Sequence, residues 1–140
     1  MKNQLEMDIK VPNQTRYLGL IGRIGEDIAY TLKNFKNNRE ELAYHINLVL
    51  TEAMANAIKH ANKNDPNKDV HITINVSDKN LCIKVYDQGQ GFDISDTQKL
   101  LPDPTEDHGR GIFLIHALMD SVTYKHCENG NVLEMNKTFS

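Results

Sequence analysis

Several features that would assign a protein to a class at once are scarce in this sequence. The chain has only two cysteines, Cys82 and Cys127, and neither belongs to a CxxC pair. Free thiols of a cytoplasmic protein are therefore expected rather than a disulfide or a metal site. The longest apolar stretch, Gly111–Met119, is broken by His116 and is too short to span a bilayer. The first ten residues lack the apolar run of a signal peptide.

An excess of basic residues is also missing. The chain has 16 Lys and Arg against 19 Asp and Glu, and its formal net charge is -3. Direct binding to nucleic acid is therefore not predicted, because such binding needs a basic surface. With 39% hydrophobic and 25% charged residues, the composition is that of a globular protein. Without a repeat or a clear linker, residues 1–140 are expected to form a single domain.

The apolar residues alternate in some segments and recur at helical spacing in others. In chain order they predict a strand at 7–11, helices at 18–35 and about 39–61, strands at 70–76 and 81–85, a short helix at about 111–119, and a hairpin of 122–127 and 132–139. Asn13 is a candidate cap for the first helix, and Asn129-Gly130 is the expected hairpin turn. The order of elements predicts an α+β two-layer sandwich, with a mostly antiparallel sheet and helices on one face.

The segment Phe92–His108 fits none of these elements. It contains Pro102 and Pro104, and irregular loops of this length are uncommon in small domains unless they act as lids. We therefore predict a lid that is mobile without a ligand and more ordered with one. Its many carboxylates cannot all face a phosphate group, because like charges repel, so they are expected to face solvent or a partner. These are Asp93, Asp96, Asp103, Glu106 and Asp107.

A first block of polar residues lies on the predicted second helix. Glu52, Asn56 and His60 are spaced by four, so they share one face of the helix, apart from its apolar stripe. Taken alone, such residues usually form a solvated surface.

A second block, Asp87-Gln-Gly89-Gln-Gly91, follows the strand at 81–85. Asp87 has the same strand parity as the apolar residues before it, so its side chain should point inward. A buried carboxylate needs hydrogen-bond donors, and an adenine amino group would be one. The glycines would let a ligand approach the backbone closely. Taken alone, a strand-ending Asp with a glycine-rich turn explains the block equally well.

A third block, His108-Gly109-Arg110-Gly111, leads into the short helix. Free N–H groups at a helix start favour phosphate, and Arg110 could add a charged donor. Taken alone, a flexible glycine pair that closes the lid is an equal alternative. Neither glycine pair completes GxGxxG, because Ile94 and Leu114 stand at the third position, and GxxxxGK[ST] is absent. The dinucleotide and P-loop motifs are therefore excluded.

Together, the order and spacing of the three blocks resemble the N box and the two glycine boxes of the GHKL superfamily of ATPases. Within it, the chain is similar to the small stand-alone branch of anti-sigma regulatory factors that are also serine/threonine protein kinases. The segments EAMANAIKHA at 52–61 and GIFLIHALMD at 111–120 carry this resemblance, which covers almost the whole chain.

The resemblance implies a nucleotide whose base lies at the second block. Asp87 would accept a hydrogen bond from the adenine amino group of ATP, and Gly89 and Gly91 would shape the purine pocket.

The resemblance also implies a phosphate side built from the other two blocks. Asn56 would be the side-chain ligand to Mg²⁺, with phosphate oxygens and water completing the coordination. Glu52 would be the catalytic general base. Gly109, Arg110 and Gly111 would surround the phosphates. His60 matches a position near the end of the N box and is expected to be structural.

The first helix carries Gly19, Gly22 and Gly25, although each glycine costs about 1 kcal/mol relative to alanine in a helix interior. A stripe of small residues allows close approach of another helix, and two alternatives stay open. It contacts either a partner, together with Arg16 and Arg23, or another helix of the same domain.

Three functions are consistent with these observations. The leading one is a serine/threonine protein kinase that acts on an antagonist protein and binds a sigma factor. The alternative is an ATP-dependent protein-binding switch without phosphotransfer. The third, the ATP-binding part of a histidine kinase, is disfavoured because 140 residues leave no room for a phosphoacceptor hairpin. The expected partners are regulatory proteins, with a homodimer left open, in the cytoplasm.

Overall fold

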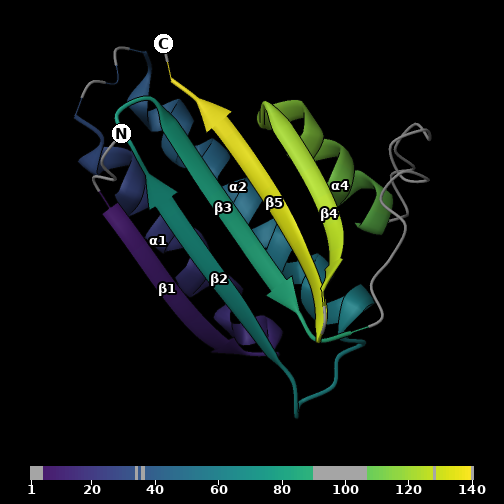
Figure 1. The fold of residues 1–140 in the computed structure, drawn as a ribbon. Coiled ribbons are helices and arrows are strands. Elements are labelled where there is room, and N and C mark those ends of the chain that lie inside the picture. Colours follow the sequence, from purple (N-terminus) through teal and green to yellow (C-terminus); the bar gives the residue numbers. More distant parts are fainter. Residues whose placement is uncertain (1–4, 34, 36, 90–106, 128, 140) are drawn as a thin grey trace.

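The computed structural model describes residues 5–33, 35, 37–89, 107–127 and 129–139. Within these ranges, five strands form one sheet in the order β1-β2-β3-β5-β4, and every neighbouring pair is antiparallel. The helices lie together on one face of this sheet (Figure 1). The predicted α+β sandwich is therefore confirmed. The elements are β1 (Leu5–Pro12), α1 (Leu18–Thr31), α2 (Arg39–Asn56), β2 (Asp69–Val76), β3 (Asn80–Asp87), α4 (Asp107–Leu118), β4 (Ser121–Cys127) and β5 (Gly130–Thr138), with short helical turns η1 (Thr15–Tyr17) and η2 (Ala57–Ala61).

The core lies between the sheet and the helices. Along β2 and β3, buried and half-buried residues alternate strictly, as the sequence pattern predicts. Register places Ile74 opposite Ile83, and both side chains are at most 1% exposed. From the helix side, Leu50 and Met54 of α2 are fully buried in the same cluster. Burying each such side chain contributes about 1.5–3 kcal/mol, so this alternation fixes which face of the sheet receives the helices.

The two long helices have clear ends. Asn38 caps α2, since its side-chain oxygen accepts a hydrogen bond from the Glu41 N–H at 3.1 Å. The Arg39 guanidinium donates to the carbonyls of Ala29 at 2.7 Å and Leu32 at 2.6 Å, which satisfies the C-terminus of α1. The first helix therefore ends at Thr31, before the Leu32 and Phe35 that continue its apolar spacing.

Three local predictions were wrong. Asn13 does not cap a helix, because its side chain is 3% exposed and bonds Asp65 and Asn62 instead. The second helix does not stay α-helical to Ala61, since Ala57–Ala61 forms a π-helical turn. In the hairpin, Cys127 pairs with Gly130, so Gly130 is the first residue of β5 rather than part of the turn.

Gly130 does need to be glycine. Its φ is 155°, and a Cβ there would lie 1.9 Å from the backbone oxygen of Asp87. Glycine is thus required at position 130 because the backbone of β3 lies so close to it, and not because the residue forms the hairpin turn.

The glycine stripe of α1 serves mainly to pack this helix on α2. A Cβ at Gly22 would lie 2.6 Å from Asn47 Oδ1, and one at Gly25 would lie 2.6 Å from a Leu50 methyl group. Gly19 has nothing within 4 Å. For two of the three glycines, the structure therefore selects packing within the chain over contact with a partner.

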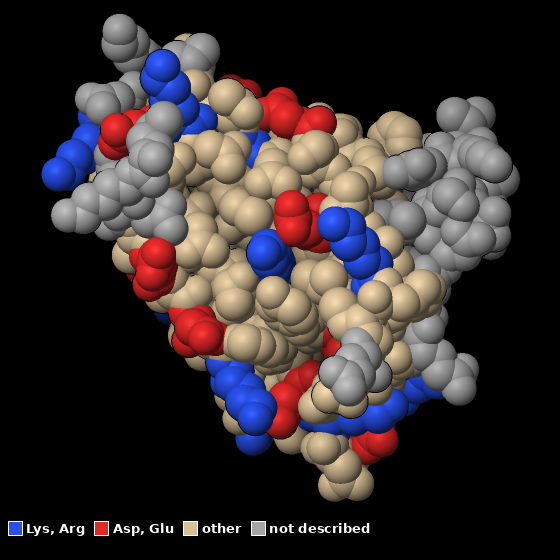
Figure 2. Space-filling view, in the orientation of Figure 1, with Lys and Arg blue, Asp and Glu red and all other residues tan. Residues whose placement is uncertain are grey.

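The other face of the sheet carries no helix and is polar. Basic and acidic side chains are interspersed across it without a patch of one sign (Figure 2). They form ion pairs between strands, such as Lys84–Glu134 at 3.8 Å. Both cysteines are free, as predicted. Burial, and then the charge of Glu134, raise the pKa of the Cys82 thiol, against a lowering by Lys84.

The predicted lid, Phe92–His108, and Gly91 lie almost entirely outside the described residues, so the prediction of its mobility stays a prediction. No helix in the described part of the chain combines the length and the apolar character needed to cross a membrane.

Candidate functional site

The first block lines a cavity on the helix side of the molecule. This cavity has a volume of about 240 Å³, and Glu52, Asn56 and His60 all border it, as their shared helix face predicts. Lys59 also lines this cavity. Its ammonium group brings positive charge to a cavity that also contains a carboxylate. Sequence reasoning did not single out Lys59, because an exposed lysine on a helix carries no signal of its own.

Asn56 is unusual among the buried polar groups. Its side chain is 4% exposed, and its Nδ2 has no hydrogen-bond partner in the described part of the chain. Leaving a buried donor unpaired costs about 1–3 kcal/mol. Such a group in a native fold calls for an explanation, and a ligand in the adjoining cavity is one.

The third block meets the first at Gly111. A Cβ at Gly111 would lie 2.6 Å from Glu52 Oε2 and 3.4 Å from Asn56 Nδ2. Any side chain here would therefore occupy the space beside the carboxylate and the amide. Gly109, Arg110 and Gly111 lie within α4, which begins at Asp107 instead of near Gly111 as predicted. His108, Gly109 and Arg110 thus lie in the first turn of the helix, where the first four backbone N–H groups lack intrahelical partners. The side chain of Arg110 is outside the described residues.

The second block holds a buried carboxylate. Asp87 is the last residue of β3 and is 5% exposed, so its predicted inward direction is confirmed. Asn131 Nδ2 donates to Asp87 Oδ1 at 2.8 Å, and the Gly89 N–H donates to the same oxygen at 3.0 Å. The Tyr124 hydroxyl donates to Asp87 Oδ2 at 3.1 Å. A carboxylate offers about four acceptor positions, so three protein donors leave room for one more on Oδ2.

Asn131 and Tyr124 are site residues that the sequence did not reveal. Asn131 is 2% exposed, and its Nδ2 donates to the carbonyl of Gly89 at 3.0 Å as well as to Asp87. Its Oδ1 is in contact with the His126 ring. Asn131 shares strand parity with Leu133 and Met135, which predicts an inward side chain. Only the pairing of β5 with β3, however, places it opposite Asp87.

The second block also meets the end of the first. A Cβ at Gly89 would lie 1.5 Å from the carbonyl oxygen of Ala61, in η2. The three sequence blocks thus converge, with Gly89 against the end of η2 and Gly111 against Glu52 and Asn56. Gly91 is outside the described residues.

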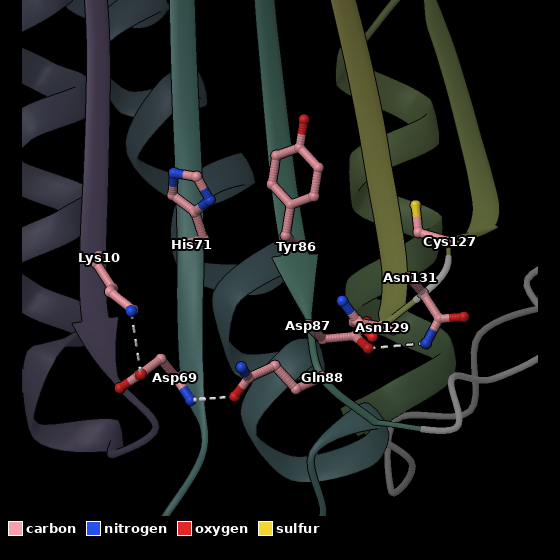
Figure 3. A pocket seen from close by; sticks show the side chains of 10 residues that line it. Lys10, Asp69, His71, Tyr86, Asp87, Gln88, Cys127, Asn129 and Asn131 are labelled. Carbon is pink, nitrogen blue, oxygen red and sulfur yellow. Dashed lines mark hydrogen bonds and ion pairs between the residues drawn. The ribbon is translucent and has the colours of Figure 1, made fainter.

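A larger cavity, of about 390 Å³, opens on the sheet face that carries no helix (Figure 3). The rings of His71 and Tyr86 stack across it with centroids 5.2 Å apart, and Lys10 pairs with Asp69 at 3.8 Å. Asp87 stands at its edge, where β3 ends. None of the described residues that line it belongs to the first or third block. We therefore place the candidate site on the helix side.

The family described as histidine kinase-like ATPase domain matches residues 15–137. The chain belongs to this family. It is 31% identical to the serine-protein kinase RsbW of Bacillus subtilis, over 98% of this chain and 88% of that protein. It is 32% identical to the serine-protein kinase RsbW of Bacillus licheniformis, over 94% and 84%.

A solved structure is similar to this histidine kinase-like ATPase in fold. It is the histidine kinase domain of a blue-light activated histidine kinase from Erythrobacter litoralis, with a TM-score of 0.57 and 19% identity. The match covers 91% of this chain and 61% of that chain. The predicted superfamily and its serine/threonine kinase branch are therefore confirmed, and membership of an ATPase family implies that the chain uses ATP.

Proposed function

We propose that this chain is an anti-sigma regulatory factor with serine/threonine protein kinase activity, which phosphorylates an antagonist protein and binds a sigma factor. The observation that carries the proposal is the convergence of Glu52, Asn56 and Gly111 at one cavity. A carboxylate can take the proton of the acceptor hydroxyl, an amide can help to hold a metal ion, and a helix start that contains glycines can approach phosphate closely. Similarity to proteins named serine-protein kinase supports the choice of acceptor.

In this proposal, the adenine of ATP lies at Asp87 and the triphosphate at the start of α4. Asp87 Oδ2 accepts a hydrogen bond from the adenine amino group through the acceptor position that Tyr124 leaves open. The backbone of Gly109 and Gly111 and the side chains of Arg110 and Lys59 surround the phosphates. The second-block glycines, Gly89 and Gly91, shape the purine pocket.

Asn56 fits a role as the side-chain ligand to Mg²⁺. Its amide nitrogen is bound to no described group, so the protein does not hold the amide through that nitrogen, and Oδ1 is the atom that would bind the ion. Oxygen ligands from one side chain, phosphate and water suit Mg²⁺, which keeps several waters. When bound, the ion would neutralise phosphate charge. Among the described residues, no three His, Cys, Asp or Glu side chains form a metal cluster of their own.

Glu52 acts as the general base. It lies one helical turn from Asn56, so both side chains reach the same phosphate region. The serine or threonine oxygen attacks the γ-phosphorus, the bond from that phosphorus to the β,γ-bridging oxygen breaks, and Glu52 takes the hydroxyl proton. ADP and the phosphorylated antagonist are the products.

The test is incubation of the purified protein with labelled ATP, Mg²⁺ and candidate partners encoded near its gene. We expect label on a serine or threonine of one partner. If instead a partner binds only with ATP present and no label is transferred, the protein is a nucleotide-dependent switch.

Asn56→Ala tests the metal site, because the Mg²⁺ dependence of nucleotide binding should disappear in this variant. An unchanged Mg²⁺ dependence would contradict the assignment.

A further inference from the structure

Asn62 is the most completely buried polar residue described in this chain, at 0% exposure, and it follows η2 directly. Its Oδ1 accepts a hydrogen bond from the Gln88 N–H at 2.8 Å. Its Nδ2 donates to Asn13 Oδ1 at 3.0 Å and to the Asp69 carbonyl at 3.3 Å. Both ends of the amide are therefore used, whereas the amide nitrogen of Asn56 has no described partner.

The partner Gln88 is the residue between Asp87 and Gly89. Its backbone N–H belongs to the peptide group that directly follows Asp87, so the bond from Asn62 fixes the backbone next to the adenine acceptor. Asn131, on β5, donates to both the Asp87 carboxylate and the Gly89 carbonyl. The turn is thus held by two buried asparagines from separate elements.

The π-helical turn sets the position of Asn62. The Asn62 N–H donates to the Ala57 carbonyl at 2.7 Å, a bond that spans five residues. The helix then ends with Lys63 and Asn64 at positive φ, 51° and 57°. Positive φ is unfavourable for residues other than glycine, and π-helical turns often mark functional sites. The same helix carries Asn56 and Glu52 about two and about three turns before Asn62.

We propose that Asn62 is a positioning residue that fixes the base-binding turn, Asp87–Gly89, relative to the helix that carries Glu52 and Asn56. It does not touch the nucleotide. The close contact of Gly89 with the Ala61 carbonyl leaves no space for a side chain between turn and helix, and the Asn62–Gln88 hydrogen bond sets their register. The inference rests on the proposed nucleotide site, but not on phosphotransfer.

The test compares Asn62→Ala with Asn13→Ala by calorimetric titration of each with Mg²⁺-ADP. Both changes disrupt the same buried hydrogen-bond cluster, so both should lower the midpoint of thermal unfolding. Only Asn62→Ala removes the acceptor for the Gln88 N–H. We expect Asn62→Ala to weaken ADP binding by roughly tenfold and Asn13→Ala to bind ADP as the parent does. Equal affinities in both variants would show that Asn62 is only structural and overturn the proposal.

A measurement on the parent protein covers the case in which Asn62→Ala does not fold. The Gln88 amide should be protected from hydrogen exchange even without nucleotide, because its partner is a buried protein oxygen. Exchange as fast as that of an exposed amide would overturn the proposal. If the parent fails to bind ADP, the proposed nucleotide site itself is wrong. If the parent binds ADP but phosphorylates no partner, the kinase proposal fails and this inference stands.

Discussion

The base side and the phosphate side of the candidate site are built differently. On the base side, the Asp87 carboxylate receives hydrogen bonds from Asn131, Gly89 and Tyr124 before any ligand binds. On the phosphate side, the buried amide nitrogen of Asn56 has no partner in the described part of the chain. The base side is thus preorganised by the protein, whereas the phosphate side depends on what binds there.

This difference has a physical reason. An adenine ring is recognised by a few directed hydrogen bonds, so its acceptor must be held in place at little cost upon binding. A triphosphate with its metal carries its own charge and water, and it supplies hydrogen-bond acceptors that the buried Asn56 amide lacks in the described part of the chain. The following predictions test that contrast, from the largest expected effect to the smallest.

The strongest test on the phosphate side is Glu52→Gln. This change removes the proposed base but keeps the size of the side chain, so Mg²⁺-ATP affinity should stay close to that of the parent. Phosphorylation of the antagonist should fall by at least about a hundredfold, since general base catalysis contributes about 10²–10⁴-fold. Initial rates with labelled ATP measure the loss. Glu41→Gln, an exposed position on the same helix, is the control and should have no effect. Normal phosphorylation by Glu52→Gln would mean that another group, or none, is the base.

The matching test on the base side is Asp87→Asn. The domain should stay folded, because the Tyr124 hydroxyl can turn to accept a hydrogen bond from the new amide. Affinity for ADP should fall more than about tenfold, because a hydrogen bond to a charged acceptor contributes about 1.5–3 kcal/mol. Isothermal calorimetry measures this affinity, with Asp27→Asn on the exposed face of α1 as the control. ADP binding as tight as in the parent would remove Asp87 from the adenine site.

Two glycine substitutions compare the rigidity of the two sides. Gly89→Ala would meet the backbone of Ala61, which cannot move without shifting η2, so the free energy of unfolding should fall by about 1–3 kcal/mol. Gly111→Ala would meet the end of the Glu52 side chain at 2.6 Å and would be in ordinary contact with Asn56 Nδ2 at 3.4 Å, so its nearest neighbours are side-chain atoms rather than backbone. Its stability loss should be below about 1 kcal/mol, because alanine also favours the helix. Urea unfolding measures both values, and equal losses would show that the two sides are equally rigid.

The smallest effect is expected in the nucleotide-free protein, when Asn131 on the base side and Asn56 on the phosphate side are each replaced by alanine. Asn131→Ala leaves Asp87 with one donor fewer and should lower the free energy of unfolding by about 1–2 kcal/mol. Asn56→Ala removes a donor that has no partner, so stability should stay within about 0.5 kcal/mol of the parent. Thermal unfolding of both variants without ATP decides the comparison. A loss in Asn56→Ala as large as in Asn131→Ala would show that Asn56 is held by the protein itself.

Much of the fold follows from local patterns. The alternation along β2 and β3, and the same parity for Asp87, are properties of the strand repeat, so the inward carboxylate could be predicted from the sequence. The element boundaries were less accurate. Asparagine often caps helices, so Asn13 was a reasonable candidate. In the folded chain, however, its side-chain oxygen accepts a long-range hydrogen bond from Asn62 instead.

The sequence by itself determined the fold class and, through the resemblance that the three blocks carry, the ATPase family, because both depend on residue type and spacing along the chain. Only the tertiary structure decided which side chains surround the three blocks. Strand register brings Asn131 and Tyr124 to Asp87, and the π-helical turn brings Asn62 to Gln88. Helix packing, not a partner, explains Gly22 and Gly25. Contacts between residues 25 to 44 positions apart leave no periodic trace in the sequence, since each is fixed by the packing of whole elements rather than by its neighbours.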